Sequence, residues 1–501
     1  MKGPRKLLGL SFGLAMVAAA CGGSATVAST SPAASSPAAA SSALGKPSAA
    51  ASSGPASGTA ASGAASGSAA GSAAAKPSGA ASGPASAAAP ASASGSAAAA
   101  ASGNPIKIGD IVPLTGVQAI LGTDNRDGTN LYLDSINNTV AGRKIDVTYS
   151  DDSADATVGL TKAKELVENQ KVNLLMGFNA TPVCYAVSTY VQQAQIPMMV
   201  TANCAAQDIL LDPKYKSQYV SRWTINNGGG FAPPGDWLYK QGYRKLSVFA
   251  ADFGAGHEFA DIISAAFVED GGSVVQIQYP KVGTTDYSPV IAQLDPSADI
   301  VATFLPGIDG LRFYQAYQSP GAKHPPAFDT TNSATAGQPL DQLKDLAVGV
   351  KGSNIYTPAI DSQMNQTFLK QFATKFPGRS VSSTVANGYA SAQVLVAALQ
   401  KVNGNIEDKQ AFLNALYATD METIKGQLKL DQNHDIIEND YIVQVVKNPD
   451  GTYGHKLLDT YKGTTELWNF TPDQITKLQI GKDAIKWTQT DKTKLDQLLK
   501  G

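Results

Sequence analysis

The stretch NLLMGFNATPVCYAVSTYV, residues 173–191, contains residues whose types and spacing could do chemistry. An apolar run breaks at Gly177 into the polar residues Asn179 and Thr181 on either side of Ala180, and apolar residues then resume with helical spacing. A loop of this kind could hold a nucleophile, cradle a phosphate or bind a small molecule. The unpaired backbone N–H groups at the start of the following helix favour a carboxylate or another small anion.

The catalytic interpretations of this loop lack their supporting motifs. A phosphate-binding loop requires a Gly-Lys-Ser/Thr element that is not present, and the sequence after residue 104 has no Gly-x-Ser-x-Gly nucleophile elbow. Cys184 has no histidine near it in sequence, and the chain has 4 histidines that share no metal-ligand spacing. We therefore expect no enzymatic activity, no cofactor and no metal site.

A second loop, DFGAGHEF at residues 252–259, resembles both a dinucleotide fingerprint and a kinase Asp-Phe-Gly element. The third glycine of the fingerprint and every other kinase motif are missing. The glycines are better explained as a tight turn from strand to helix, with Phe253 exposed at the end of the strand. The alternative is that Phe253 only packs in the interior, as most aromatic residues do.

A third segment, DQNHDIIEND at residues 431–440, has part of the spacing of a calcium-binding loop. The glycine that such a loop requires is Ile436 here, and its twelfth-position glutamate is Ile442. A solvated hairpin turn is the better interpretation.

The first part of the chain indicates export. Basic residues precede an apolar run, Leu7 to Ala20, and residues 1–20 are interpreted as a signal peptide. Small residues before Cys21 resemble the lipidation site of bacterial lipoproteins, although the usual leucine is Ala18. We expect Cys21 to carry a lipid anchor in the membrane; the alternative is plain signal cleavage that leaves Cys21 an idle thiol.

Residues 21–104 form an Ala/Ser/Gly/Pro-rich segment that cannot build a core and is expected to be a disordered linker. A flexible coil of about 80 residues has a root-mean-square span of roughly 50 Å. Once Cys21 is set aside, Cys184 and Cys204 remain, an even number in an oxidising compartment, and we expect a disulfide between them. Two buried free thiols are the alternative. The formal net charge of -2 gives no support to a nucleic-acid partner.

From Pro105 onward, apolar strand-like runs alternate with helical patterns, which predicts an α/β fold with parallel sheets. The pattern starts afresh after an irregular stretch at residues 221–237, so two similar α/β lobes are expected. A long helical run then precedes a β-rich end at 426–446, and residues 466–501 are polar. The predicted strands are 106–113, 144–152, 172–177 and 196–201 in the first lobe, and 246–252, 273–280, 299–306 and 327–331 in the second.

Several stretches between residues 106 and 446 together resemble the Leu/Ile/Val-binding family of ABC-transporter substrate-binding proteins. They include IKIGDIVPLTGVQAILG, SDDSADATVGLTKAKELV, IPMMVTANC, SRWTINN, VFAADFGAGHEFADII, VGTTDYSPVIAQL, ANGYASAQVLVAAL and GQLKLDQNHD. The resemblance implies a type I periplasmic binding protein fold: two Rossmann-like lobes, each with a central parallel sheet, joined by three crossovers near 224–227, 354–357 and 426–429. Lobe one would combine 105–225 with 356–427, lobe two 226–355 with 428–465, and 466–501 would be a peripheral C-terminal tail.

The resemblance also implies a set of ligand-binding residues. The ligand carboxylate would be held after the third and fourth strands, at Asn179, Ala180 and Thr181 and at Ala202, Asn203 and Cys204, with Gln118 as a further candidate. A bridge between Cys184 and Cys204 would tie these two loops together.

From the second lobe, the family's aromatic lid residue corresponds to Phe253. Its acidic residue for a ligand ammonium corresponds to Thr284 or Thr285, so an α-amino acid would lack its charge partner unless Asp329 or Asp309 substitutes.

The implied function is a non-catalytic, monomeric receptor outside the cytoplasm. It would capture a small amino-acid-like or carboxylate-bearing solute between its lobes and deliver it to an ABC permease in the membrane. Ligand that contacts both lobes would stabilise the closed form. The alternative is a sensor of the same fold that signals to a membrane partner.

Overall fold

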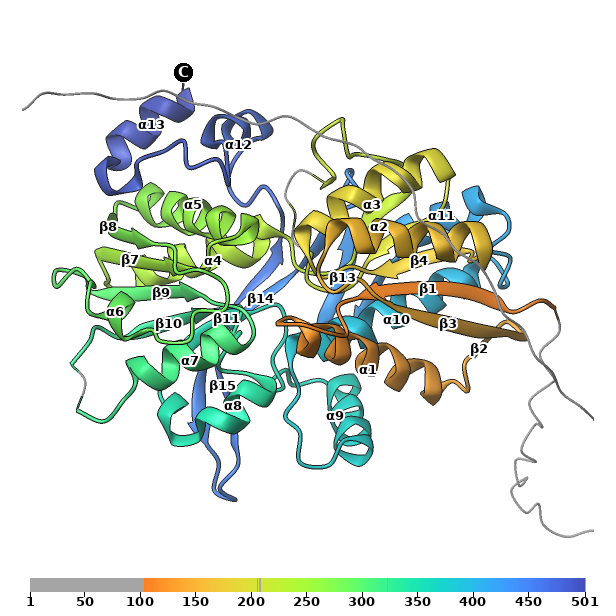
Figure 1. Cartoon of the computed structure of the whole chain (residues 1–501), viewed down its shortest axis with the longest axis horizontal. Helices are drawn as coiled ribbons and strands as arrows, with labels where there is room; N and C mark the ends of the chain where they lie inside the picture. Colours follow the sequence, from red (N-terminus) through yellow and green to blue (C-terminus); the bar gives the residue numbers. More distant parts are fainter. Residues whose placement is uncertain (1–102, 205, 207–208, 322, 501) are drawn as a thin grey trace, which may run out of the picture. The chain divides into compact units, whose positions relative to one another are not determined.

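The computed structural model describes residues 103–500 except 205, 207, 208 and 322 (Figure 1). The predicted signal peptide 1–20, the predicted lipidation site Cys21 and almost all of the predicted linker 21–104 lie outside the described residues. No helix in the described part of the chain has the length and apolar character needed to cross a bilayer.

Six strands form the first sheet. They are β1 (Ile106–Val112), β2 (Thr139–Val140), β3 (Arg143–Asp151), β4 (Leu174–Gly177), β5 (Met198–Val200) and β6 (Val220–Arg222). Their order is β2-β3-β1-β4-β5-β6, and every pair is parallel except the β2–β3 hairpin. The parallel register puts the carboxyl ends of β1, β4 and β5 at one edge, where ligands of open α/β sheets bind.

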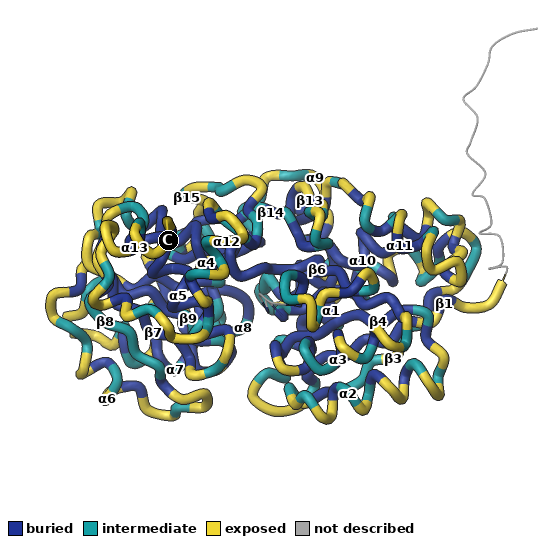
Figure 2. Tube along the Cα trace, turned by 90° about the horizontal axis from the view of Figure 1, so that it is seen from above, coloured by how far each residue is buried: buried dark blue, intermediate teal, exposed yellow. Residues whose placement is uncertain are grey.

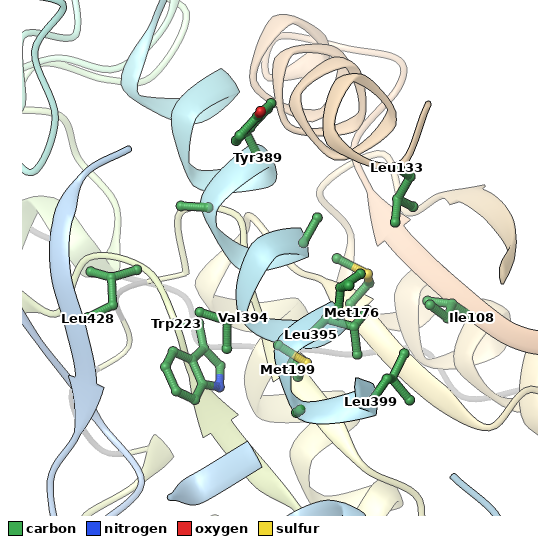
Figure 3. Packing of buried hydrophobic residues seen from close by; sticks show 14 of the residues in the cluster. Ile108, Leu133, Met176, Met199, Trp223, Tyr389, Val394, Leu395, Leu399 and Leu428 are labelled. Carbon is green, nitrogen blue, oxygen red and sulfur yellow. The ribbon is translucent and has the colours of Figure 1, made fainter. Parts of the chain in front are cut away.

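Helices cover both faces of this sheet. They are α1 (Ala119–Ser135), α2 (Ala156–Lys164), the π-turn η1 (Glu165–Asn169), α3 (Thr181–Ala194), α9 (Gln363–Lys375), α10 (Ser383–Lys401) and α11 (Lys409–Tyr417). Side chains alternate along each strand, so Ile108 and Met176 join a core with Leu395 of α10 (Figure 3), whereas Ile111 joins a core with Val187 of α3. This two-sided burial explains the continuous apolar runs in the sequence.

The second sheet contains the remaining strands. They are β7 (Lys245–Ala250), β8 (Ser273–Gln278), β9 (Ile300–Phe304), β10 (Ala327–Thr330), β11 (Lys351–Asn354), β12 (Asp420–Thr423), β13 (Gly426–Leu430), β14 (Ile436–Lys447) and β15 (Tyr453–Thr464). The order is β12-β13-β14-β11-β10-β9-β7-β8, with β15 paired to β14. Strands β7 to β11 pair in parallel, and β14 adds to β11 antiparallel.

The helices of this half are α4 (Asn227–Lys240), α5 (Gly254–Glu269), α6 (Ser288–Ile291), α7 (Ile308–Tyr317), α8 (Gly337–Leu343) and the 3₁₀ turn η3 (Lys344–Ala347). One face of the sheet packs with α4 and α5 and the other with α7 and α8. Figure 2 shows buried strands inside each half, with exposed loops and helix faces around them. The α/β class with two sheets is thus confirmed, as are all eight predicted strands to within a few residues. The first sheet is parallel apart from β2, and the second is mixed, because β12 to β15 pair only antiparallel.

The chain changes from one core to the other three times. Trp223 packs in the first core and Ile225 in the second, and Ile355 packs in the second core and Tyr356 in the first. These two changes lie within or beside the ranges 224–227 and 354–357. The third lies later than 426–429: Ile436 is still in the first core, and Ile442 of the same strand is in the second.

Residues 466–500 are more than a polar tail. They form α12 (Pro472–Leu478), the 3₁₀ turn η4 (Trp487–Gln489) and α13 (Lys492–Lys500). Trp487 and Leu495 are buried in the core of α4 and α5, and the Trp487 indole N–H donates to Asp261 of α5 at 2.7 Å. The segment lies at the outside of the second half, but its apolar side chains complete that core.

Candidate functional site

The loop after β4 has the tight geometry that the sequence indicates. Gly177 has a φ of 102°, and a Cβ there would lie 2.4 Å from Oδ1 of Asp110 and 2.5 Å from the carbonyl oxygen of Ile111. Only glycine fits this position. The chain then turns into α3, whose first residue Thr181 follows Ala180, and no side chain caps the helix.

Three of the sequence-predicted residues are joined by their side-chain amides. Asn179 donates from Nδ2 to Oε1 of Gln118 at 2.6 Å, and Asn203 donates from Nδ2 to Oδ1 of Asn179 at 3.1 Å. Gln118 precedes α1, Asn179 follows β4 and Asn203 follows β5, so the parallel register of the strands brings them together. Asn179 and Thr181 are buried, and Gln118 and Asn203 are half-buried.

The backbone of the loop after β5 is less available than the sequence indicates. The N–H groups of Ala202 and Cys204 donate to the carbonyl oxygens of Gly177 and Phe178 at 2.9 and 3.2 Å. Both residues are fully buried. In this structure these two N–H groups are already paired, so Asn203 is the residue of this loop that presents polar atoms.

The same two loops are linked covalently. Cys184 in the first turn of α3 and Cys204 form a disulfide, with Cα atoms 6.6 Å apart. The bridge and the backbone bonds from Ala202 and Cys204 hold the loops after β4 and β5 together as one unit. A fixed arrangement lowers the entropy lost when a ligand is bound.

The amide chain continues to residues that sequence reasoning did not single out. Nδ2 of Asn203 also donates to Oγ1 of Thr384 at 3.0 Å, and Asn387 donates to Oδ1 of Asn203 at 3.2 Å. Nζ of Lys425 donates to Oδ1 of Asn387 at 2.8 Å. Both residues lie on α10, and Asn387 belongs to the stretch ANGYASAQVLVAAL, for which the sequence offered only a resemblance.

On the second sheet, Phe253 stands between β7 and α5. It precedes α5 directly, and the turn requires Gly256, because a Cβ there would lie 1.9 Å from the carbonyl oxygen of Ala251. The Phe253 ring is half-buried and stacks on Phe304 with centroids 6.0 Å apart. Its ring is therefore neither fully packed nor free, which suits an aromatic face next to a ligand.

Asp329 and Asp309 are the candidate partners for a ligand ammonium, and both already have other contacts in the structure. Both carboxylate oxygens of the buried Asp329 accept hydrogen bonds, from Ser333, Ala334 and Thr335. Burial raises the pKa of Asp329 to about 6, and these hydrogen bonds oppose that rise. Asp329 thus fixes the loop after β10.

Two further candidates lie near one another. Oδ2 of Asp309 accepts from the backbone N–H of Gly283 at 2.8 Å, and Oδ1 lies 3.8 Å from Nη1 of Arg312. Thr284 donates from Oγ1 to the carbonyl oxygen of Lys281 at 2.6 Å. Burial raises the pKa of Asp309. Oδ1 of Asp309 has no hydrogen-bond partner among the described residues, but the Arg312 guanidinium already balances the charge of this carboxylate. Thr284 carries no charge.

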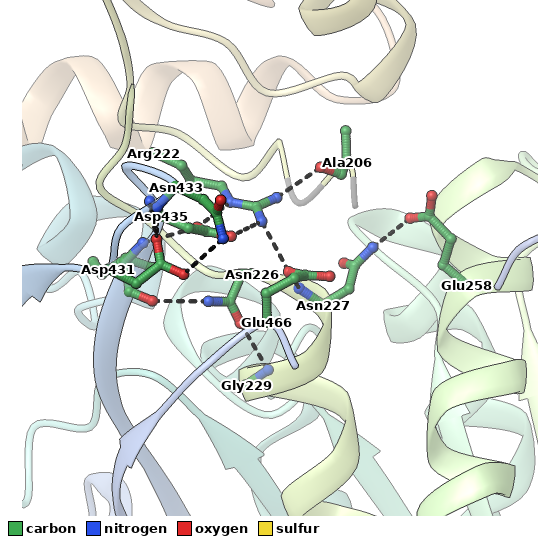
Figure 4. A network of polar contacts seen from close by, with 11 residues as sticks. Ala206, Arg222, Asn226, Asn227, Gly229, Glu258, Asp431, Asn433, Asp435 and Glu466 are labelled. Atoms are coloured by element: carbon green, nitrogen blue, oxygen red, sulfur yellow. Dashed lines mark hydrogen bonds and ion pairs between the residues drawn. The ribbon is translucent and has the colours of Figure 1, made fainter. Parts of the chain in front are cut away.

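A buried ionic network lies where the chain first changes core (Figure 4). The Arg222 guanidinium donates to both oxygens of Asp435 at 2.8 and 2.5 Å, to Glu466 at 2.8 Å and to the carbonyl oxygen of Ala206 at 2.8 Å. All three charged residues are buried. Asp435 is part of the segment rejected above as a calcium loop, so its carboxylate serves an ion pair instead. Among the described residues, no group of three or more His, Cys, Asp or Glu is arranged to hold a metal ion.

Comparisons with known proteins agree on one architecture. The sequence model of a family described as periplasmic binding protein matches residues 105–452. The Leu/Ile/Val-binding protein homolog 6 of Brucella melitensis is 28% identical over 368 residues, which cover 72% of this chain and 93% of that protein.

Two solved structures are similar over the same region. An ABC transporter substrate-binding protein from Sphaerobacter thermophilus has a TM-score of 0.68 at 28% identity, covering 72% of this chain and 99% of that one. A solute-binding protein of an ABC transporter from Rhodopseudomonas palustris BisB5, in complex with 3,4-dihydroxybenzoic acid, has a TM-score of 0.66 at 26% identity, covering 72% and 98%.

Proposed function

The chain belongs to the periplasmic binding protein family, and from that premise we propose that it captures a small carboxylate-bearing solute and delivers it to the permease of an ABC importer. The family is one of extracytoplasmic solute-binding proteins. The signal peptide, the lipid on Cys21 and the linker 21–104 are the parts of this proposal that would hold the receptor near the membrane as a monomer.

The solute lies between two lobes in this proposal. The first lobe comprises 105–225 and the segment from 356 onward, and the second comprises 226–355 and the end of the β-rich region. We put the last boundary within β14, because Ile436 and Ile442 belong to different cores. Residues 466–500 belong to the second lobe, since Trp487 and Leu495 pack in its core.

The class of solute is inferred from the hydrogen-bond donors and carboxylates that each lobe offers to a ligand. The first lobe offers the amide groups of Gln118, Asn179 and Asn203 and the uncapped start of α3. On the second lobe, Asp329 is fully engaged and Thr284 is uncharged. A ligand ammonium without a charged partner is costly to bury, whereas a carboxylate has donors in place. An amine-free acid therefore fits better than an α-amino acid.

The aromatic ring of Phe253 and the relative from Rhodopseudomonas palustris suggest a specific probe. That relative was solved with 3,4-dihydroxybenzoic acid, an amine-free carboxylate whose ring could stack on Phe253. Ring stacking contributes about 0.5–1.5 kcal/mol beyond the area buried.

Isothermal titration calorimetry of the full chain with 3,4-dihydroxybenzoate, benzoate and leucine tests the proposal. We expect at least one amine-free acid to bind ten times more tightly than leucine or better. Tighter binding of leucine would overturn the argument from Thr284 and Asp329. Failure of every carboxylate in a broader panel to bind would overturn the solute class itself.

A further inference from the structure

Lys425 is a fully buried lysine in the turn between β12 and β13. Its Nζ lies 2.6 Å from Oε2 of Glu438 and 2.8 Å from Oδ1 of Asn387. The backbone around it is fixed as well, because its N–H donates to Oγ1 of Thr423 at 3.1 Å and its carbonyl oxygen accepts from the Tyr441 hydroxyl at 2.8 Å. The ammonium group is therefore held at one place in the first core.

Stability alone does not explain this ion pair. Glu438 is also buried, and taking both charges out of water costs several kcal/mol per ion, by order of magnitude. Replacing such a pair by apolar residues is often neutral or stabilising. Burial lowers the pKa of Lys425 and raises that of Glu438, and each charge opposes the shift of the other. We therefore looked for a role of this ion pair other than stabilising the fold.

The position of Lys425 fixes the direction of the amide chain. An ammonium has only donors, so Asn387 must turn its oxygen toward Lys425 and its NH₂ toward Asn203. The same constraint then passes along the chain: the Asn203 oxygen accepts from Asn387, and the Asn203 NH₂ donates to Asn179. Asn179 in turn donates to Gln118. Without a donor-only group at one end, all the amides in the chain could flip together, because the oxygen and NH₂ ends of an amide have nearly the same shape.

The far end of the chain faces the candidate ligand site. Oε1 of Gln118 accepts from Asn179 at 2.6 Å, so Gln118 is left with its NH₂ group, which has no hydrogen-bond partner among the described residues. At this end of the chain, Gln118 can therefore donate hydrogen bonds to a ligand. A donor end binds a carboxylate and disfavours an ammonium or any other donor of the ligand.

We propose that Lys425 is a positioning residue for ligand specificity: through Asn387, Asn203 and Asn179 it orients the amide of Gln118 so that donors meet the ligand carboxylate. The proposal rests on the carboxylate-binding function proposed above. Glu438 neutralises the ammonium and keeps it in the core. Lys425 itself touches no ligand.

The test compares three variants of the full chain. Lys425→Met removes the donor, but leaves Glu438 unpaired and could unfold the protein. The double variant Lys425→Met with Glu438→Met removes the pair together, which avoids an unpaired buried charge. Glu438→Asp keeps both the lysine donor and a carboxylate beside it, and is the matched control. Circular dichroism first shows which variants are folded.

The ligand readout is a ratio of two dissociation constants, measured by calorimetry with 3,4-dihydroxybenzoate and 3,4-dihydroxybenzamide. The carboxamide has the same ring, but its amide group has an NH₂ donor as well as a carbonyl acceptor, whereas the carboxylate only accepts hydrogen bonds. We expect the double variant to lose at least tenfold in carboxylate-over-carboxamide selectivity, and Glu438→Asp to keep this selectivity within threefold. Equal losses for both ligands would show a merely structural role and overturn the proposal.

A second readout needs no ligand and separates this proposal from the proposed function. Side-chain NH₂ resonances of the isotope-labelled, unliganded protein report the state of each amide. We expect the double variant to shift the resonances of Asn387, Asn203, Asn179 and Gln118. A shift confined to Asn387 would overturn the proposal. If wild type binds neither probe, the proposed ligand class fails, and these resonances alone decide whether Lys425 orients the chain.

Discussion

Charged side chains that are removed from water carry the largest energies at the scale of single residues. Arg222 forms ion pairs with both Asp435 and Glu466 inside the protein, so its guanidinium is the shared partner of the two carboxyl groups. Burial raises the pKa of Glu466, and the positive charge of Arg222 opposes that rise. Removing the arginine would leave two carboxyl groups without their partner.

We predict that Arg222→Met destabilises the protein by about 3–5 kcal/mol, the usual result of breaking a buried ion pair from one side. Urea denaturation at neutral pH measures the free energy of unfolding. Arg244→Met is the control, because Arg244 is exposed: its guanidinium donates to the backbone carbonyls of Tyr239 and Tyr243 and lies over the Tyr239 ring. Equal effects of the two substitutions would contradict a structural role for the buried network.

Asp110 gives a prediction about pH. It is fully buried in β1, and neither of its oxygens has a hydrogen-bond partner among the described residues. Burial, with a contribution from the negative charge of Asp152, raises the pKa of Asp110 to about 7, and Arg126 opposes this. Because the folded state holds this proton more tightly than the unfolded state does, its stabilising effect is present below about pH 4 and is lost as the pH rises through 7.

We therefore predict that wild type loses about 3 kcal/mol of stability relative to Asp110→Asn between pH 5 and pH 8. The asparagine is neutral throughout this range, so the difference between the two proteins isolates Asp110. Denaturation curves at several pH values measure it. A difference that does not change with pH would mean that Asp110 is not a buried proton-binding group.

Residue types predicted part of the candidate site. The loop of Asn179 was marked by its place between a predicted strand and a helix, whereas Asn203 and Gln118 were implied by the resemblance to the substrate-binding family. Lys425 was not selected, because a lysine in the segment IKGQLKL has the alternating pattern of a surface strand. Its partners Asn387 and Glu438 are 38 and 13 positions away in the sequence, and only the folded structure brings the three together.

At the scale of elements, the C-terminal helices illustrate how sequence and structure differ. Leu495 in α13 is fully buried, whereas Leu498 is 38% exposed. The lysines and aspartates around them made residues 466–501 look peripheral, because a short amphipathic helix contributes only a few apolar residues to a core. The eight predicted strands were easier to recognise in the sequence, since burial of a parallel sheet on both faces leaves long apolar runs.

These two leucines provide a matched pair. We predict that Leu495→Ala lowers the free energy of unfolding by about 2–4 kcal/mol and Leu498→Ala by less than about 1 kcal/mol. Urea denaturation of the two variants and wild type measures the difference. Similar small effects would show that α13 is not docked in the second core.

The third change of core could not be placed from the sequence for a related reason. Strand β14 is 12 residues long and enters both cores, with Ile436 in the first and Ile442 in the second. The polar residues Glu438, Asn439 and Asp440 separate its two apolar parts, and in the sequence they indicate part of a hairpin turn rather than a strand that passes between cores. The first two changes follow breaks between strands and helices, which the sequence does mark.

At the scale of the whole molecule, the proposed site combines unlike surfaces of the two cores around one ligand. The first core presents oriented amide donors at Gln118 and Asn179, and the second presents the half-buried ring of Phe253. A solute that contacts both cores favours the conformation in which they are close, by the difference in its affinity for the two conformations.

The most direct test of this shared site is calorimetry of 3,4-dihydroxybenzoate, or of the carboxylate that binds wild type most tightly, with Asn179→Ala and Phe253→Ala. The account predicts that each substitution, one in each half of the molecule, weakens binding at least tenfold. Unchanged affinity in either variant would contradict a site built by both halves.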